Sequence, residues 1–302
     1  MSHHGHSHRV RSSRALGLVL VLTVAYTIAE IVGGVLTGSL ALLADAGHMI
    51  GDSAAIALAL GAAWLAARPA TPKRSFGYRR AEILAALANG VALVAIAIWV
   101  FVEAVMRLDH PPRILAGWML VVALVGLLVN LAAAGILARV SEENLNVQAA
   151  LRHVIADLAG SAGVVAAALV VIATGWRQAD PIAGMAIAFL ILGSSWTILR
   201  DSVAILLEET PAGIDAQEVG RRMAAAEGVV EVHDLHIWTI TSGFPTLSAH
   251  VLVGRGDDCH ARRRELEELL RREFGLEHTT LQVEHAGESE GLQITRLGRG
   301  PS

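Results

Sequence analysis

Four side chains with metal-ligand chemistry recur at one spacing in two apolar stretches of the chain. His48 and Asp52 lie four residues apart, and so do His153 and Asp157. Residues four apart share one face of a helix, so each pair forms an edge with one imidazole and one carboxylate. Ionisable groups inside apolar helices cost roughly 2.5–3.5 kcal/mol each on insertion scales, which indicates that these four have a function.

Two such edges that face each other would offer two nitrogen and two oxygen donors, a set suited to tetrahedral Zn²⁺. With neutral imidazoles the set carries about two negative charges, which a divalent cation cancels. Both ligand types also accept protons, so metal and protons compete for them, near physiological pH for histidine. The sequence therefore predicts a reversible zinc site at His48, Asp52, His153 and Asp157.

The elements that must position these residues are membrane helices. The chain has 302 residues, of which 54% are hydrophobic and 17% charged, and its mean hydropathy is +0.53. A window of roughly 20 apolar residues, the length that spans a bilayer, finds six segments. They cover residues 16–36, 40–67, 81–105, 115–138, 147–173 and 181–207. The two metal-ligand pairs fall in the second and fifth segments, as an inverted repeat would place them.

The charges orient the segments and exclude one class of partner. The N-terminal tail and the second and fourth connections together hold 9 Lys and Arg, against 3 in the first, third and fifth connections, so the positive-inside bias predicts cytoplasmic termini. A net charge of −4 without an extended basic run gives no electrostatic footprint for nucleic acid. The single cysteine, Cys259, excludes an intramolecular disulfide.

We expect four parts: a His-rich tail at residues 1–14, a six-helix transmembrane domain at 15–208, a cytosolic domain at 209–286 and a flexible tail at 287–302. The periodicity of residues 214–285 predicts the order αββαβ, a small α+β sheet with helices on one face. His233 and His236, three apart in a regular strand, should face opposite sides. The N-terminal histidines fit a metal-collecting arm, a loose tail or an added tag.

Several motifs together resemble the cation diffusion facilitator family, most closely its zinc-transporting branch. They are LLADAGHMIGDS at residues 42–53, FGYRRAEIL at 76–84, DPI at 180–182, LLEETP at 206–211 and VHDLHIW at 232–238. The resemblance covers about residues 14–285. It implies that the four predicted ligands form the transport site, and it implies proton antiport out of the cytoplasm, a ferredoxin-like cytosolic domain and a homodimer formed through that domain.

The resemblance also implies a second use of zinc. His233, His250 and His285 match positions that bind regulatory metal in some members, with His260 or Cys259 as a further ligand. Gly287 departs from that pattern, because those members have a carboxylate there. The alternative is that these histidines line a dimer interface.

The sequence thus predicts a multi-pass exporter of Zn²⁺ in exchange for protons, in a bacterial-type inner membrane, that is not an enzyme. A membrane metalloenzyme would need an open metal position and a base, as in His-Glu-x-x-His, which the chain lacks. A membrane metal sensor would bind the ion without moving it. Among the other intramembrane polar residues, Glu30, Asp45 and Asp201 stay open between helix-to-helix hydrogen bonds and function, whereas Asn89 and Asn130 are expected to be hydrogen bonders.

Overall fold

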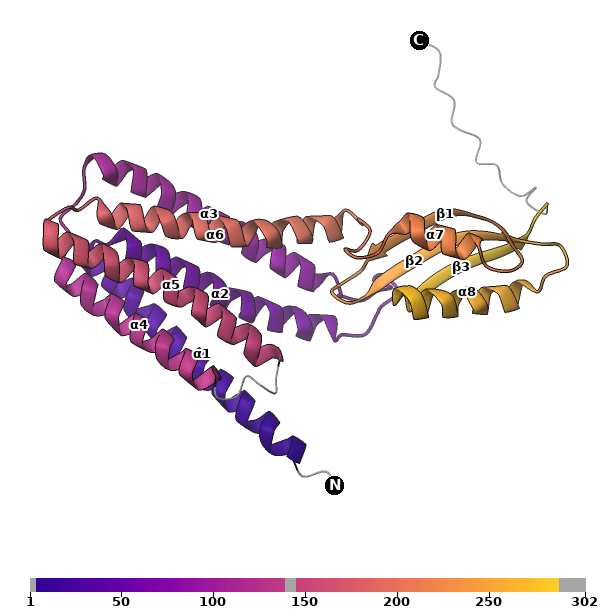
Figure 1. Cartoon of the computed structure of the whole chain (residues 1–302), viewed down its shortest axis with the longest axis horizontal. Helices are drawn as coiled ribbons and strands as arrows, with labels where there is room; N and C mark the ends of the chain where they lie inside the picture. The colour runs from indigo at the N-terminus through magenta and orange to yellow at the C-terminus, as the bar shows by residue number, and fades with distance from the viewer. Residues whose placement is uncertain (1–3, 139–144, 288–302) are drawn as a thin grey trace, which may run out of the picture. The chain divides into compact units, whose positions relative to one another are not determined.

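The computed structural model describes residues 4–138 and 145–287. The chain divides into two compact units, Met1–Gly61 with Ala85–Leu199, and Ala62–Leu84 with Arg200–Ser302. Six of the described helices are long and apolar enough to cross a membrane, as predicted. They are α1 (His4–Thr37), α2 (Leu40–Ala66), α3 (Ala81–Asp109), α4 (Ala116–Ala138), α5 (Leu145–Thr174) and α6 (Ala179–Leu206) (Figure 1).

The predicted tails are only partly covered by the structure. Helix α1 starts at His4, so most of the tail expected at residues 1–14 continues the first helix. Residues 1–3 and 288–302 lie outside the described part, and with them nearly all of the predicted C-terminal tail.

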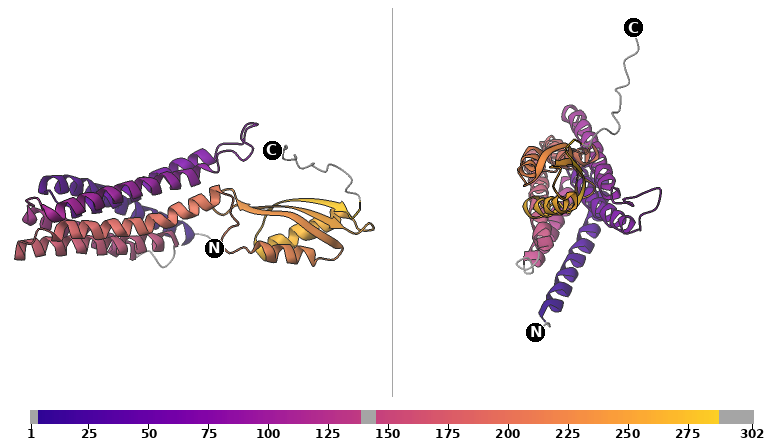
Figure 2. Two further views of the ribbon diagram at one scale, coloured as in Figure 1. Left: turned by 90° about the horizontal axis from the view of Figure 1, so that it is seen from above. Right: turned by 90° about the vertical axis from the view of Figure 1, so that its right-hand side faces the viewer.

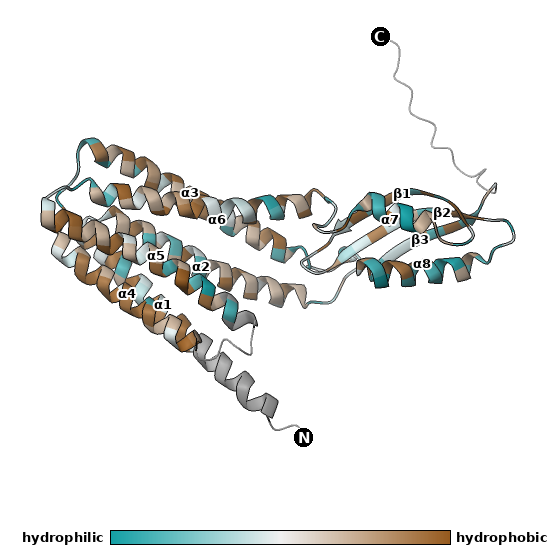
Figure 3. Ribbon diagram, in the orientation of Figure 1, coloured by the Kyte–Doolittle hydropathy of each residue, from teal (hydrophilic) through white to brown (hydrophobic). Residues whose placement is uncertain are grey.

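Close packing in the first unit depends on small residues where helices meet. A side chain at Gly126 of α4 would place its Cβ 2.0 Å from the Tyr26 hydroxyl of α1, and one at Gly51 of α2 would lie 2.1 Å from Leu93 of α3. Glycine therefore lets these helix pairs approach closely, as is usual where lipid gives helices no hydrophobic reason to associate. The outward faces stay apolar (Figure 3), with Trp118, Leu190 and Trp196 at least 66% exposed.

The second unit contains the predicted αββαβ order. Its elements are α7 (Ala216–Ala224), β1 (Val229–Thr239), β2 (Pro245–Val253), α8 (Cys259–Phe274) and β3 (His278–His285). The strands lie in the order β1-β2-β3, with β1 antiparallel and β3 parallel to β2. Both helices cover one face of the sheet (Figure 2), where alternate β2 residues from Leu247 to Val253 are buried against Leu266 and Leu270 of α8.

One sequence expectation about this sheet is wrong. His233 pairs with His250 and His236 with Ser248, and the register shifts between the two histidines. Directly opposite residues of antiparallel strands point to the same side, and positions 248 and 250 share a face. His233 and His236 therefore lie on the same face, because an irregularity at Asp234, whose φ is +52°, adds one residue to the strand.

Candidate metal centre

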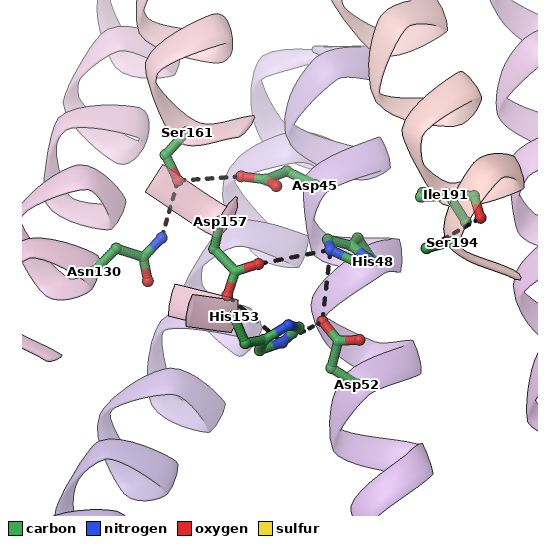
Figure 4. Close-up of polar contacts among 9 residues, drawn as sticks. All are labelled: Asp45, His48, Asp52, Asn130, His153, Asp157, Ser161, Ile191 and Ser194. Atoms are coloured by element: carbon green, nitrogen blue, oxygen red, sulfur yellow. Dashed lines mark hydrogen bonds and ion pairs between the residues drawn. The ribbon is translucent and has the colours of Figure 1, made fainter. Parts of the chain in front are cut away.

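The four predicted ligands lie together between α2 and α5 (Figure 4). The His48 Nε2 atom is 3.6 Å from Asp52 Oδ2, its neighbour one turn along α2, and 3.6 Å from Asp157 Oδ1 of α5. Helical spacing puts the first pair on one face, and the packing of the two helices adds the second contact.

His153 completes the arrangement from α5. Its Nε2 atom lies 3.1 Å from Asp52 Oδ2 and 3.7 Å from Asp157 Oδ2. The two imidazole rings have centroids 6.2 Å apart at an angle of 63°. Each imidazole therefore contacts both carboxylates, and each carboxylate contacts both imidazoles.

The separations among His48, Asp52 and Asp157 fit one shared ion, whereas His153 does not join this group of mutually close ligand atoms. Two ligands that are both bound to tetrahedral zinc at its usual nitrogen and oxygen distances are about 3.3 Å apart. The four contacts between imidazole and carboxylate span 3.1 to 3.7 Å. Within the described residues, the only group of at least three His, Cys, Asp or Glu ligand atoms within 4.8 Å of one another is formed by His48, Asp52 and Asp157.

Buried polar atoms of the cluster that lack hydrogen bonds also support a metal site. His48 Nδ1, Asp52 Oδ2 and Asp157 Oδ1 are buried and form no hydrogen bond, although the two oxygens lie 3.6 Å or less from imidazole nitrogens. Burying polar atoms without a partner is costly, and a metal ion would provide a partner for the carboxylate oxygens. The donor set, with two imidazoles, two carboxylates and no thiolate, suits a divalent ion that must be released again.

Access to the cluster is uneven. The side chains of His153 and Asp52 are 47% and 26% exposed, whereas that of Asp157 is 8% exposed. Asp52 lies on the side of His48 toward the end of α2, and His153 lies on the side of Asp157 toward the start of α5. The more exposed ligands of the cluster, Asp52 and His153, thus lie toward the end of α2 and the start of α5.

A buried polar network adjoins the cluster on its other side. Asn130 of α4 donates to Ser161 of α5 at 3.1 Å, and the Ser161 hydroxyl donates to Asp45 of α2 at 3.4 Å (Figure 4). The expectation that Asn130 bonds between helices is confirmed. Glu30, which is fully buried, accepts from the Tyr26 hydroxyl at 3.0 Å.

Asp180 positions the helix that carries two of the ligands, a role that its DPI motif does not reveal. Asp180, fully buried in the first turn of α6, accepts hydrogen bonds from the Ser39 hydroxyl at 2.5 Å and the backbone N–H groups of Leu40 and Ala41 at 2.8 and 3.2 Å. It therefore caps the start of the helix that carries His48 and Asp52. Ser39, an N-cap residue type directly before an apolar run, is the only local signal for this start.

The cytosolic ligand candidates form two pairs rather than one cluster. His233 and His250 face each other with ring centroids 5.4 Å apart. His285 lies elsewhere on the sheet, paired in register with Val253, and its Nε2 is 3.5 Å from Cys259 Sγ. His260 is exposed in the first turn of α8. Each pair offers two donors, fewer than a closed zinc site uses.

Two protein-family models together match most of the chain. The family model for the cation efflux transmembrane domain covers residues 16–207, and that for the cation efflux protein cytoplasmic domain covers residues 211–286. The chain belongs to the cation efflux family. Its resemblance to the cation diffusion facilitators is thereby confirmed, and it is a multi-pass membrane transporter for cations.

Several similar members of the cation efflux family are named after the metal cations that they transport. The chain is 40% identical to the cadmium, cobalt and zinc/H(+)-K(+) antiporter of Bacillus subtilis, over 93% of this chain and 92% of that one. It is 42% identical to the metal cation efflux system protein CzcD of Cupriavidus metallidurans (94% and 90%). It is 41% identical to the zinc transporter ZitB of Escherichia coli (93% and 92%).

Among solved structures, the metal-bound C-terminal domain of the CzcD transporter from Cupriavidus metallidurans matches at 36% identity. It covers 24% of this chain and 99% of that domain, with a TM-score of 0.23.

Proposed function

We propose that this cation efflux protein exports Zn²⁺ from the cytoplasm in exchange for protons, by alternating access around His48, Asp52, His153 and Asp157. The observation that carries the proposal is the set of four contacts of 3.1 to 3.7 Å between two imidazoles and two carboxylates from α2 and α5. For His48, Asp52 and Asp157 they match the spacing of ligands around one tetrahedral ion, and His153 is proposed as the fourth ligand. The names of the relatives, which include zinc, cadmium and cobalt, support the class of cargo.

Proton coupling follows from the same atoms. A metal ion binds only to an unprotonated imidazole nitrogen, whereas a protonated imidazole pairs with a carboxylate at the distances found here. Zinc and protons therefore exclude each other at His48 and His153. Metal release on the side with the higher proton concentration is then favoured, and the returning protons reset the site. The antiporter name of the Bacillus relative is consistent with this exchange.

The direction of transport depends on the orientation of the helices. Arg68, Lys73, Arg74, Arg79 and Arg80 occupy the connection between the second and third spans, and the positive-inside bias places it in the cytoplasm. Four further spans separate this connection from the C-terminal domain, so both lie on one side and both termini are cytoplasmic. Because the more exposed ligands lie toward the end of α2 that leads into this connection, we propose that the cluster loads from the cytoplasm of a bacterial-type inner membrane.

The cytosolic domain is proposed to join two copies of the chain. The open face of its sheet, which carries His233, His236 and His250, is the surface that α7 and α8 leave uncovered. Regulatory metal binding at His233, His250, His285 and His260 stays a prediction, which the two-donor pairs support only as halves of a site.

Zinc flux into proteoliposomes with a controlled pH gradient tests the transport proposal. We expect flux that reverses with the gradient, and a fall of at least about 100-fold in Asp157→Ala, because three ligands cannot cancel the charge of the ion. Asp201→Asn, an exposed aspartate of α6, is the matched control. Undiminished flux in Asp157→Ala would overturn the assignment, and zinc binding without flux in the unaltered protein would indicate a sensor.

A further inference from the structure

The second unit contains a cavity that the transport proposal does not use. It has a volume of about 850 Å³ and lies between the connection from α2 to α3, the segment after α6, and strands β1 and β2. Its charged and polar lining residues include Lys73, Arg74, Arg79, Arg80, Glu208 and Thr210. The lining therefore contains four cationic side chains but only one carboxylate.

The single carboxylate, Glu208, already forms an ion pair with Arg80. Arg80 donates to Glu208 at 2.8 Å. Among residues 4–138 and 145–287, no carboxylate lies within ion-pair distance of Lys73, Arg74 or Arg79. The cavity thus keeps three positive charges without a counter-charge from the part of the chain described.

Aromatic rings hold two of these charges in place without neutralising them. The Arg74 guanidinium lies over the Tyr78 ring, 4.3 Å from its centroid, and donates to the Tyr78 hydroxyl. The Arg79 guanidinium lies 4.4 Å from the centroid of Phe244. Stacking on a ring leaves the edge of a guanidinium free to donate to an oxyanion. A fixed, unneutralised arginine pair of this kind suits recognition of phosphate.

The location of the cavity favours a ligand from the membrane. The basic residues lie between the end of α2 at Ala66 and the start of α3 at Ala81, both of them spanning helices. Trp64, 66% exposed near the end of α2, carries the Arg68 guanidinium 4.2 Å from its ring centroid. Tryptophan with a basic neighbour is typical of the membrane–water boundary, so the connection begins at headgroup depth.

Orientation of the helices alone does not account for this geometry. The positive-inside bias requires basic residues near the membrane, but it does not require that they surround a hollow or stack on aromatic rings. Here they converge on a cavity that Ser75, Thr210 and Ser248 supply with neutral hydroxyl donors. Basic pockets beside spanning helices on the cytoplasmic side bind anionic headgroups, each charge contributing about 1 kcal/mol near the surface.

We propose that this cavity binds a phosphate-bearing anion, and that its occupant is the headgroup of an anionic phospholipid. The phosphate lies against Lys73, Arg74 and Arg79, while Arg80 remains paired with Glu208. Because Glu208 follows α6 and the basic residues link α2 to α3, the bound headgroup fastens the ends of three spans to the cytosolic domain within one unit.

The test compares three full-length proteins purified in detergent. They are the unaltered protein, the triple variant K73Q/R74Q/R79Q, and the control R263Q/R264Q/R272Q, which removes equal charge from α8. Native mass spectrometry measures how much phosphatidylglycerol and phosphatidylcholine each retains. We expect the unaltered protein and the control to prefer phosphatidylglycerol by about tenfold or more, since three charge contacts at about 1 kcal/mol each exceed a tenfold ratio. In the triple variant we expect the preference to vanish.

Competition with free anions and a folding control complete the experiment. Equal retention of both lipids by the unaltered protein, or an undiminished preference in the triple variant, overturns the proposal. Inorganic phosphate and ATP at millimolar concentration are added as competitors, and complete displacement of the lipid would show that a free anion is the occupant and overturn the lipid assignment. An unchanged melting temperature and unchanged zinc flux, both measured in phosphatidylcholine where no anionic headgroup is present, show that the triple variant folds.

Discussion

The imidazoles of the membrane helices lie beside carboxylates, whereas those of the cytosolic sheet lie beside each other. His48 and His153 each contact two carboxylates at 3.1 to 3.7 Å. His233 and His250 face each other at 5.4 Å, and of these two only His233 has a carboxylate within ion-pair distance in the part of the chain described, Glu231 at 3.4 Å. The first set is the one for which we propose a complete ion site, whereas the second offers two donors and so supplies part of a site.

The difference reflects how each element spaces its residues. An i, i+4 pair on a helix brings an imidazole and a carboxylate to one point, and two such helices supply four donors. A strand places only alternate residues on one face, so ligands from neighbouring strands meet in pairs unless a third strand contributes. In this sheet β3 presents His285 opposite Val253, three positions along β2 from His250.

The largest expected effect separates the two groups directly. We expect His153→Ala to lower zinc flux by at least about 100-fold, because it removes one of the four ligands of the proposed transport site. His233→Ala should change flux by less than about threefold, in keeping with a site outside the conduction path. Proteoliposome flux under a fixed pH gradient measures both.

Equilibrium zinc binding sharpens the same contrast. The double variant H233A/H250A should keep the zinc ion bound with highest affinity, whereas H48A/H153A should lose it. If the cytosolic double variant lost that ion and kept full flux, the highest-affinity site would be cytosolic, and the contrast between a complete and a partial site would be reversed.

An intermediate effect is expected at the cap of α2. Asp180→Asn removes the charge that accepts three hydrogen bonds from Ser39, Leu40 and Ala41. Charge-assisted bonds contribute about 2 kcal/mol, so the melting temperature should fall, and displacement of α2 should raise the zinc KM about tenfold. The pH dependence of flux should stay unchanged, because no proton-binding ligand is altered.

The control for this change is Asp109→Asn, at the exposed end of α3. If Asp180→Asn left both the KM and the melting temperature at their original values, the cap would have no part in placing His48 and Asp52.

Helical spacing alone predicted that His48 pairs with Asp52 and His153 with Asp157. The approach of one pair to the other depends on the packing of α2 against α5, which helical spacing does not specify. The six spans and the αββαβ order likewise followed from periodicity, which burial on one side of each element imposes.

The features that escaped prediction depend on contacts between distant segments or on an irregular backbone. Asp180 caps a helix that begins 140 residues earlier in the chain. The shift between His233 and His236 depends on Asp234, a residue other than glycine with a φ of +52°, and no local sequence signal specifies it. The basic cavity combines a membrane connection with strand residues, so the pattern of its arginines indicated only orientation.

The smallest expected effect concerns the start of α8, which carries Cys259 and His260. The Asp258 carboxylate accepts hydrogen bonds from the backbone N–H groups of His260 at 2.9 Å and Ala261 at 3.2 Å. These bonds favour the ionised form and lower the pKa of Asp258 below its usual 3.8. A carboxyl whose pKa is lower in the folded state stabilises that state above the unfolded pKa, and the contribution disappears as the pH falls through the folded value.

We therefore expect the first turn of α8 to lose amide protection as the pH falls below about 4. Asp258→Asn keeps a capping oxygen but cannot titrate, so that turn should lose the part of its pH dependence that comes from residue 258. Hydrogen exchange at His260 and Ala261, corrected for intrinsic rates, measures this effect. An identical pH profile in both proteins would mean that ionisation of Asp258 contributes nothing to the protection of the first turn of α8.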